Sequence, residues 1–109
     1  MTVDCFVKAS GFKILSLPHP DKEIDGVYVG DLLSWVMGRA DAGNLWITIM
    51  SNVNVIAVGS LADTSAIILA EEVTLEEDVL SVAIEKGINI LSSSLPVYET
   101  ALKTASCLS

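Results

Sequence analysis

The sequence predicts an α/β fold: a single domain over residues 1–109 with a mixed, mainly parallel sheet. Three apolar, strand-like runs, at residues 45–50, 66–70 and 88–91, each lead through small polar residues into a helical pattern. This alternation is typical of a βαβαβ core flanked by helices. The length is sufficient for one hydrophobic core without disulfides or metals.

The N-terminal part of the chain predicts a helix followed by two strands. Thr2 is suited to cap a helix that ends at Gly11. Apolar residues predict strands over 12–17 and 24–30, separated by a proline turn at 18–21. We expect these two strands to pair as a hairpin-like element beside or over the parallel sheet.

Polar residues mark where the next two helices begin. Asp31 is expected to cap a short helix over 32–37. Ser51 or Asn52 is expected to cap a helix over 53–62, whose valines and alanines indicate burial.

The last third of the chain predicts two more helices. Thr74 and Glu77 have the spacing of a capping box, before a helix that ends at Gly87. After the third strand, Ser94 is expected to cap a final helix over 95–108. The side chains expected to be buried by this helix are Tyr98, Ala101, Leu102 and Ala105.

The composition restricts the partners. The net charge is −8, from 14 acidic and 6 basic residues, which disfavours binding to nucleic acid or to an anionic membrane. Hydrophobic residues make up 51% of the chain and charged residues 18%. So apolar a composition predicts that a partner covers part of the surface, most simply in a two-fold homodimer.

The sequence favours a cytoplasmic protein. Residues 42–62 carry no charge, but Asn44 and Asn52 within them indicate a buried strand and helix instead of a membrane span. No basic segment precedes an apolar stretch at the N-terminus, as a signal peptide would require. Cys5 and Cys107 are expected to be reduced thiols, with an end-to-end disulfide as the alternative.

Three segments, taken in order, resemble the DRTGG domain: Gly26–Ser34, Leu45–Ile49 and Asn54–Val58. The resemblance covers nearly the whole chain, although the motif that names the family is reduced here to Asp25-Gly26. It implies a regulatory or accessory module that tends to dimerise, with a fold similar to the N-terminal domain of HPr kinase/phosphorylase. Such domains occur alone or joined to CBS domain pairs, phosphotransacetylases or inorganic pyrophosphatases, where other domains carry the catalysis.

Polar side chains after the strands form a candidate ligand site. The carboxyl ends of parallel strands meet at one edge, where helix N-termini and neutral hydroxyls can hold a phosphate or carboxylate. We expect a small anionic metabolite or nucleotide there; the alternative is that these residues only cap helices and close turns. The candidates are Asp31, Thr48, Ser51, Asn52, Asn54, Ser92, Ser93 and Ser94.

No residues suggest catalysis. The chain has no P-loop or dinucleotide-binding motif, and its one histidine, His19, lies in a proline turn typical of a solvated loop. We therefore predict no catalytic residues, no metal and no cofactor.

The favoured function is a non-catalytic regulatory or interaction module that homodimerises, with a possible protein partner. The alternative is a small-molecule sensor that binds its ligand at the strand ends. Aromatic side chains supply much of the buried area at interfaces. The interface candidates are Tyr28, Trp35, Val36 and Met37, while Trp46 is assigned to the core.

Overall fold

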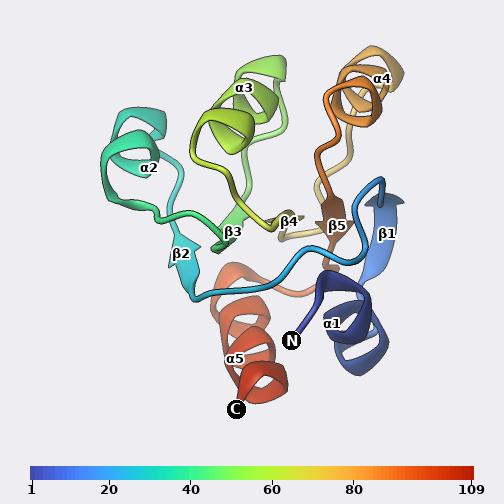
Figure 1. Cartoon of the computed structure of the whole chain (residues 1–109), viewed down its shortest axis with the longest axis vertical. Coiled ribbons are helices and arrows are strands. Elements are labelled where there is room, and N and C mark those ends of the chain that lie inside the picture. The colour runs from blue at the N-terminus through green and yellow to red at the C-terminus, as the bar shows by residue number, and fades with distance from the viewer.

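A five-stranded sheet lies between two layers of helices in the computed structural model, which describes residues 1–109 (Figure 1). The elements in order are α1 (Val3–Ser10), β1 (Lys13–Ser16), β2 (Val27–Val29), α2 (Leu33–Arg39), β3 (Leu45–Thr48), α3 (Val53–Leu61), β4 (Ala66–Leu69), α4 (Glu77–Glu85), β5 (Ile90–Ser92) and α5 (Val97–Leu108).

The sheet has the strand order β1-β5-β4-β3-β2. Strands β2 to β5 are parallel, and β1 alone runs antiparallel, to β5. Strands β3 and β4 are buried at every position, which explains why Thr48 is their one polar residue. The predicted mixed, mainly parallel sheet with its βαβαβ core is confirmed.

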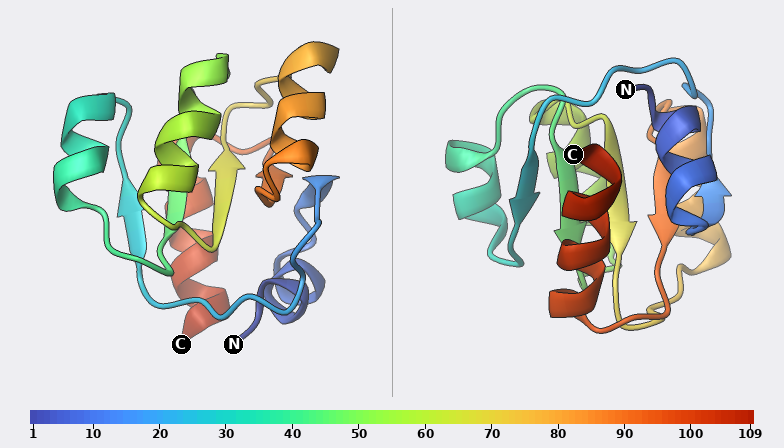
Figure 2. Two further views of the ribbon diagram at one scale, coloured as in Figure 1. Left: turned by 45° about the horizontal axis from the view of Figure 1, so that its top comes forward. Right: turned by 90° about the horizontal axis from the view of Figure 1, so that it is seen from below.

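The predicted pairing of the two N-terminal strands is wrong. Strands β1 and β2 form opposite edges of the sheet, so they do not touch. The connection over residues 17–26, here called the strap, runs across the amino ends of the strands between them (Figure 2). An extended chain spans roughly 3.3 Å per residue, so this segment is long enough to cross the width of the sheet. A hairpin turn would instead have reversed the chain and placed β2 beside β1.

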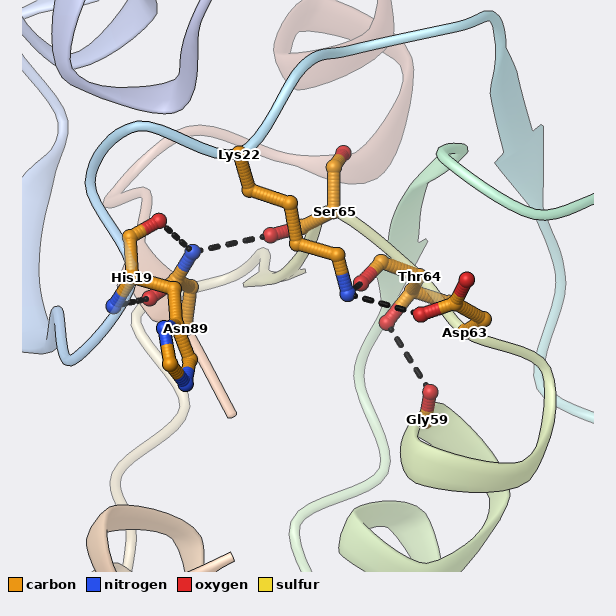
Figure 3. Close-up of polar contacts among 7 residues, drawn as sticks. All are labelled: His19, Lys22, Gly59, Asp63, Thr64, Ser65 and Asn89. Carbon is orange, nitrogen blue, oxygen red and sulfur yellow. Dashed lines mark hydrogen bonds and ion pairs between the residues drawn. The ribbon is translucent and has the colours of Figure 1, made fainter. Parts of the chain in front are cut away.

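Polar contacts hold the strap against the sheet. The Asn89 side chain accepts a hydrogen bond from His19 N at 2.9 Å, and donates to His19 O at 2.8 Å and Ser65 O at 3.0 Å (Figure 3). Lys22 Nζ forms an ion pair with Asp63 at 2.8 Å. The strap therefore closes the amino edge of the sheet and leaves the carboxyl edge for ligands.

Each face of the sheet has its own core. Helices α2, α3 and α4 cover one face, around Trp46 and Ile67, while α1 and α5 cover the other, around Phe6 and Leu45 (Figure 1). Trp46 is completely buried, as its assignment to the core predicted, and its Nε1 donates to Gly30 O at 2.9 Å.

Two predicted helix caps are confirmed. Thr2 Oγ1 accepts from Cys5 N at 3.2 Å at the start of α1, which ends at Gly11 with a positive φ of 71°. Asn52 Oδ1 accepts from Asn54 N at 2.9 Å at the start of α3.

Three predicted caps are wrong. Asp31 does not cap α2, because its carboxylate bonds to the end of β3 instead. The capping box of Thr74 does not form, because α4 begins only at Glu77. Ser94 does not cap α5, whose first N–H is instead bonded by the Glu71 side chain.

The buried face of α5 also differs from the prediction. Thr100 and Thr104 face the sheet, and Tyr98 is 68% and Leu102 52% exposed. Both threonine hydroxyls are bonded: Thr104 Oγ1 donates to Thr100 O at 2.8 Å, and Thr100 Oγ1 shares a 2.8 Å bond with Ser93 Oγ. With their hydroxyls satisfied, threonines occupy the inner face at little cost. Ala105 is exposed and Ala101 is half-buried.

Candidate functional site

The predicted site residues all lie at the carboxyl edge of the parallel strands, but they fall into separate groups. Asp31 Oδ1 accepts hydrogen bonds from Thr48 Oγ1 at 2.7 Å and from Ile49 N at 3.0 Å. These bonds tie the segment after β2 to the end of β3. The Asp31 and Thr48 side chains are therefore engaged with each other.

The second group surrounds the start of α3. Asn52 caps this helix, and both Asn52 and Asn54 are exposed. Ser51 is half-buried beside them. No cleft opens at this group, so the capping interpretation accounts for Asn52.

A cleft of about 700 Å³ opens beside the third group, Ser92, Ser93 and Ser94. We call it the β5 cleft; its lining comprises residues 11–13, 15, 72–75, 80, 92–95 and 103. These belong to the start of β1, the loop before α4, α4, the end of β5 and α5. Its volume lies within the range of roughly 300–1,000 Å³ that is usual for small-molecule sites.

Several hydrogen-bonding groups of the β5 cleft have no protein partner. The Ser93 hydroxyl is engaged, since it bonds Thr100 and accepts from Leu95 N at 3.1 Å. In contrast, no protein group bonds the hydroxyls of Ser92 and Ser94 or the main-chain N–H of Thr74.

The β5 cleft is locally basic. Lys13 and Lys103 line it, and neither takes part in the three ion pairs of the protein. Lys103 Nζ lies 5.7 Å from the centroid of the Phe12 ring. Glu72 is the one carboxylate in the lining. The hydrogen bond that Asp4 accepts raises the pKa of Lys8, but that exposed pair lies outside the cleft.

Two consecutive glutamates at the wall of the cleft have a left-handed backbone conformation. Glu71 and Glu72 have φ angles of 62° and 58°, which L-residues adopt at a cost of about 1–2 kcal/mol each. Hydrogen bonds maintain them: Glu71 N donates to Leu95 O at 2.8 Å and Glu72 N to Ser93 O at 2.9 Å. The loops before α4 and α5 are therefore fastened to each other.

Sequence reasoning missed three lining residues of the β5 cleft, Lys13, Glu72 and Lys103, and also the neighbouring Glu71. Nothing in the identity of Glu71 and Glu72 signals their positive φ. Lys13 is brought to the end of β5 because β1 pairs with β5 antiparallel, with Lys13 opposite Ser92, whereas Lys103 comes from α5. No local pattern reports that pairing.

The predicted interface residues separate on folding. Val36 is completely buried, which removes it from any surface, and Tyr28 is half-buried. Trp35 is 51% and Met37 45% exposed, but two positions along a helix point about 200° apart. The Arg39 guanidinium lies 3.7 Å from the Trp35 ring centroid and covers one of its faces.

A more continuous apolar surface lies on the other side of β2. Val27 and Val29 pair in register with Leu45 and Ile47, which face the α1/α5 core. Helices α1 and α5 leave β2 uncovered on this side (Figure 2). We call this surface the uncovered sheet face; its exposed apolar side chains are Val27, Val29 and Ile49, with the exposed Tyr98 of α5 at its border.

Helix α5 borders both this face and the β5 cleft. It packs against α1 on one side, where Lys103 reaches the Phe12 ring. Tyr98 is about 140° away from Lys103 round the helix axis, on the flank toward β2.

The structure contains no cluster of three or more His, Cys, Asp or Glu side chains that could hold a metal ion. None of its helices combines the length and apolar character needed to cross a membrane. Cys5 and Cys107 are unpaired.

No protein-family model matches the sequence, and no curated protein matches it. Among solved structures, the chain is similar to the CBS and DRTGG domains of the regulatory region of Clostridium perfringens pyrophosphatase, complexed with the activator diadenosine tetraphosphate. The TM-score is 0.75 at 12% identity, covering 97% of this chain and 46% of that one. The chain therefore has a DRTGG-like fold and spans about half the length of that structure.

Proposed function

We propose that this protein is a non-catalytic regulatory module that forms homodimers through the uncovered sheet face. The regulatory role is supported by the DRTGG-like fold, which the pyrophosphatase uses in a regulatory region. Self-association is supported by one observation above all: the exposed apolar side chains of Val27 and Val29 lie on a strand that neither α1 nor α5 covers on this side.

A second copy of the chain is the occupant that the edge of the sheet favours. Leu45 N donates to Gly26 O and Gly30 N to Ile47 O, so the intervening main-chain groups of Val27 and Val29 point away from β3. An open strand edge beside an apolar face is suited to pairing with another chain. A two-fold axis makes one such surface complementary to itself.

Light scattering after size exclusion tests the dimer at micromolar concentration. We expect wild-type protein to be dimeric and Val29→Asp to be a folded monomer, because the new carboxylate would be buried in the interface. Ile84→Asp, at a 54% exposed position on α4, should leave the dimer intact. A monomeric wild-type protein would overturn the proposal. If Trp35→Asp dissociates the dimer and Val29→Asp does not, the interface is on α2.

A second candidate function is a sensor of a small anionic molecule, and the β5 cleft with its two unpaired lysines favours it. The solved regulatory region with this fold was complexed with a nucleotide activator. Thermal shift with a nucleotide panel distinguishes the two roles, because a ligand that binds the folded state raises Tm. A shift supports the sensor, whereas co-purification of a protein partner without any shift supports an adaptor. The unpaired cysteines support a cytoplasmic location for either role.

A further inference from the structure

We propose that the β5 cleft binds a small organic phosphate, with Lys13 and Lys103 as its cationic ligands. This inference rests on the sensor function proposed above and adds the ligand class and the residues that recognise it. The site differs from the one expected from the sequence, since only the three serines after β5 belong to both.

The distribution of charge favours an anion in this cleft. The protein has a net charge of −8, so its overall field repels anions. Three lysines lack an ion-pair partner, namely Lys13, Lys86 and Lys103, and two of them line the same cleft from different elements. Two ammonium groups face a single lining carboxylate, that of Glu72, which leaves a local excess of positive charge.

The free hydrogen-bonding groups match a phosphate. A main-chain N–H can only donate, and those of Thr74, Leu75 and Ser94 bond no protein group. The hydroxyls of Ser92 and Ser94 can also donate, and phosphate oxygens accept several such bonds at once. A carboxylate ligand would use fewer of these donors.

The remaining lining indicates that the ligand has an organic part. Six of the fourteen lining residues are hydrophobic, among them Leu15, Leu75 and Leu80. The Glu72 carboxylate is an acceptor, which suits a hydroxyl group such as that of a sugar. A cleft of about 700 Å³ is also much larger than inorganic phosphate requires.

The walls of the cleft are held in place before any ligand binds. The left-handed pair Glu71 and Glu72 is bonded to Ser93 and Leu95 of the loop before α5. Strained backbone that is held by surrounding bonds recurs at binding sites, where preorganisation reduces the entropy lost on binding.

Isothermal titration calorimetry on the full chain tests the inference with five probes: AMP, ribose 5-phosphate, inorganic phosphate, adenosine and malonate. We expect AMP or ribose 5-phosphate to bind at submillimolar concentration and more tightly than inorganic phosphate, and adenosine not to bind. Lys13→Gln and Lys103→Gln should each weaken binding about tenfold, because each removes a charge-assisted hydrogen bond. Lys86→Gln removes an unpaired lysine outside the cleft and should change nothing.

Unchanged affinity in both cleft variants would overturn the inference, provided that their Tm values match the wild type. If malonate or adenosine binds and the phosphates do not, the sensor function stands and the phosphate assignment fails. If none of the five probes binds, the inference fails, and the nucleotide-panel thermal shift then decides the sensor function separately. Light scattering decides the dimer independently of both.

Discussion

Glu71 Oε2 accepts a hydrogen bond from Val97 N at 2.9 Å, so a side chain that follows β4 caps the helix that follows β5. A carboxylate at a helix N-terminus is also favoured by the helix dipole. The bond connects two neighbouring crossovers of the sheet beside the β5 cleft. It performs the role that the sequence assigns to Ser94.

Replacing Glu71 tests this cap. Glu71→Ala should lower the free energy of unfolding by about 1 kcal/mol, the usual value of a helix cap. Glu72→Ala is a matched control, because Glu72 has a similar positive φ but no side-chain hydrogen bond. Urea denaturation measures both, and equal losses in the two variants would contradict the capping role.

Asp31 is expected to stabilise the fold through the end of β3. Asp31→Ala removes the acceptor of both the buried Thr48 hydroxyl and Ile49 N, so stability should fall by about 1–2 kcal/mol. Asp41→Ala removes an exposed carboxylate without hydrogen bonds and should change stability by less than about 0.5 kcal/mol. A loss in Asp31→Ala no larger than in the control would show that these bonds contribute nothing.

Position 87 requires glycine because of its backbone conformation and the close approach of His19. Its φ is 73°, and a Cβ there would lie 2.7 Å from His19 Nε2 in the strap. Gly87→Ala should therefore cost about 2 kcal/mol. Gly38→Ala, in α2 with open space around the new methyl group, should raise stability by up to about 1 kcal/mol. Thermal unfolding separates the two, and a neutral Gly87→Ala would argue against close packing of the strap.

Asn89 is expected to be the main attachment of the strap. Asn89→Ala removes three hydrogen bonds and leaves the buried Ser65 carbonyl without this donor, so we expect a loss of about 2–4 kcal/mol. Asn54→Ala, an exposed amide in α3 with no side-chain bond, serves as the control and should be near neutral. Proteolysis within residues 17–26 should accelerate only in Asn89→Ala.

Ser65 offers a substitution that should stabilise the protein. Its hydroxyl is buried and has no hydrogen-bond partner, so Ser65→Ala should raise the free energy of unfolding by about 1 kcal/mol. Ser16 is the contrasting case, because its buried hydroxyl donates to Ile88 O at 2.9 Å and Ser16→Ala should be destabilising. A destabilising Ser65→Ala would indicate that this hydroxyl is satisfied in solution.

The order of helices and strands could be predicted because local patterns determine it. The continuous apolar runs at 45–50 and 66–70 indicate strands covered on both faces, and both are central in the sheet. The place of the two N-terminal strands could not be predicted in this way. It depends on contacts between distant residues, such as His19 with Asn89.

The residues predicted from the sequence overlap the candidate site only in part, for a related physical reason. Parallel strands bring Ser92–Ser94 to the carboxyl edge, and the sequence alone shows this. The cleft itself requires Lys13 from an antiparallel edge strand and Lys103 from α5, whose rotation was predicted incorrectly. Hydropathy places Tyr98 on the buried face of this helix. It takes no account of a threonine such as Thr104, whose hydroxyl can be buried because it bonds a main-chain carbonyl of the same helix.

Because α5 contributes Lys103 to the β5 cleft and Tyr98 to the border of the uncovered sheet face, any energetic coupling between the two surfaces must be reciprocal. If a bound phosphate compound strengthens self-association by some factor, self-association strengthens its binding by that same factor. The protein concentration would then set the apparent ligand affinity, so that titrations at different chain concentrations would give different dissociation constants.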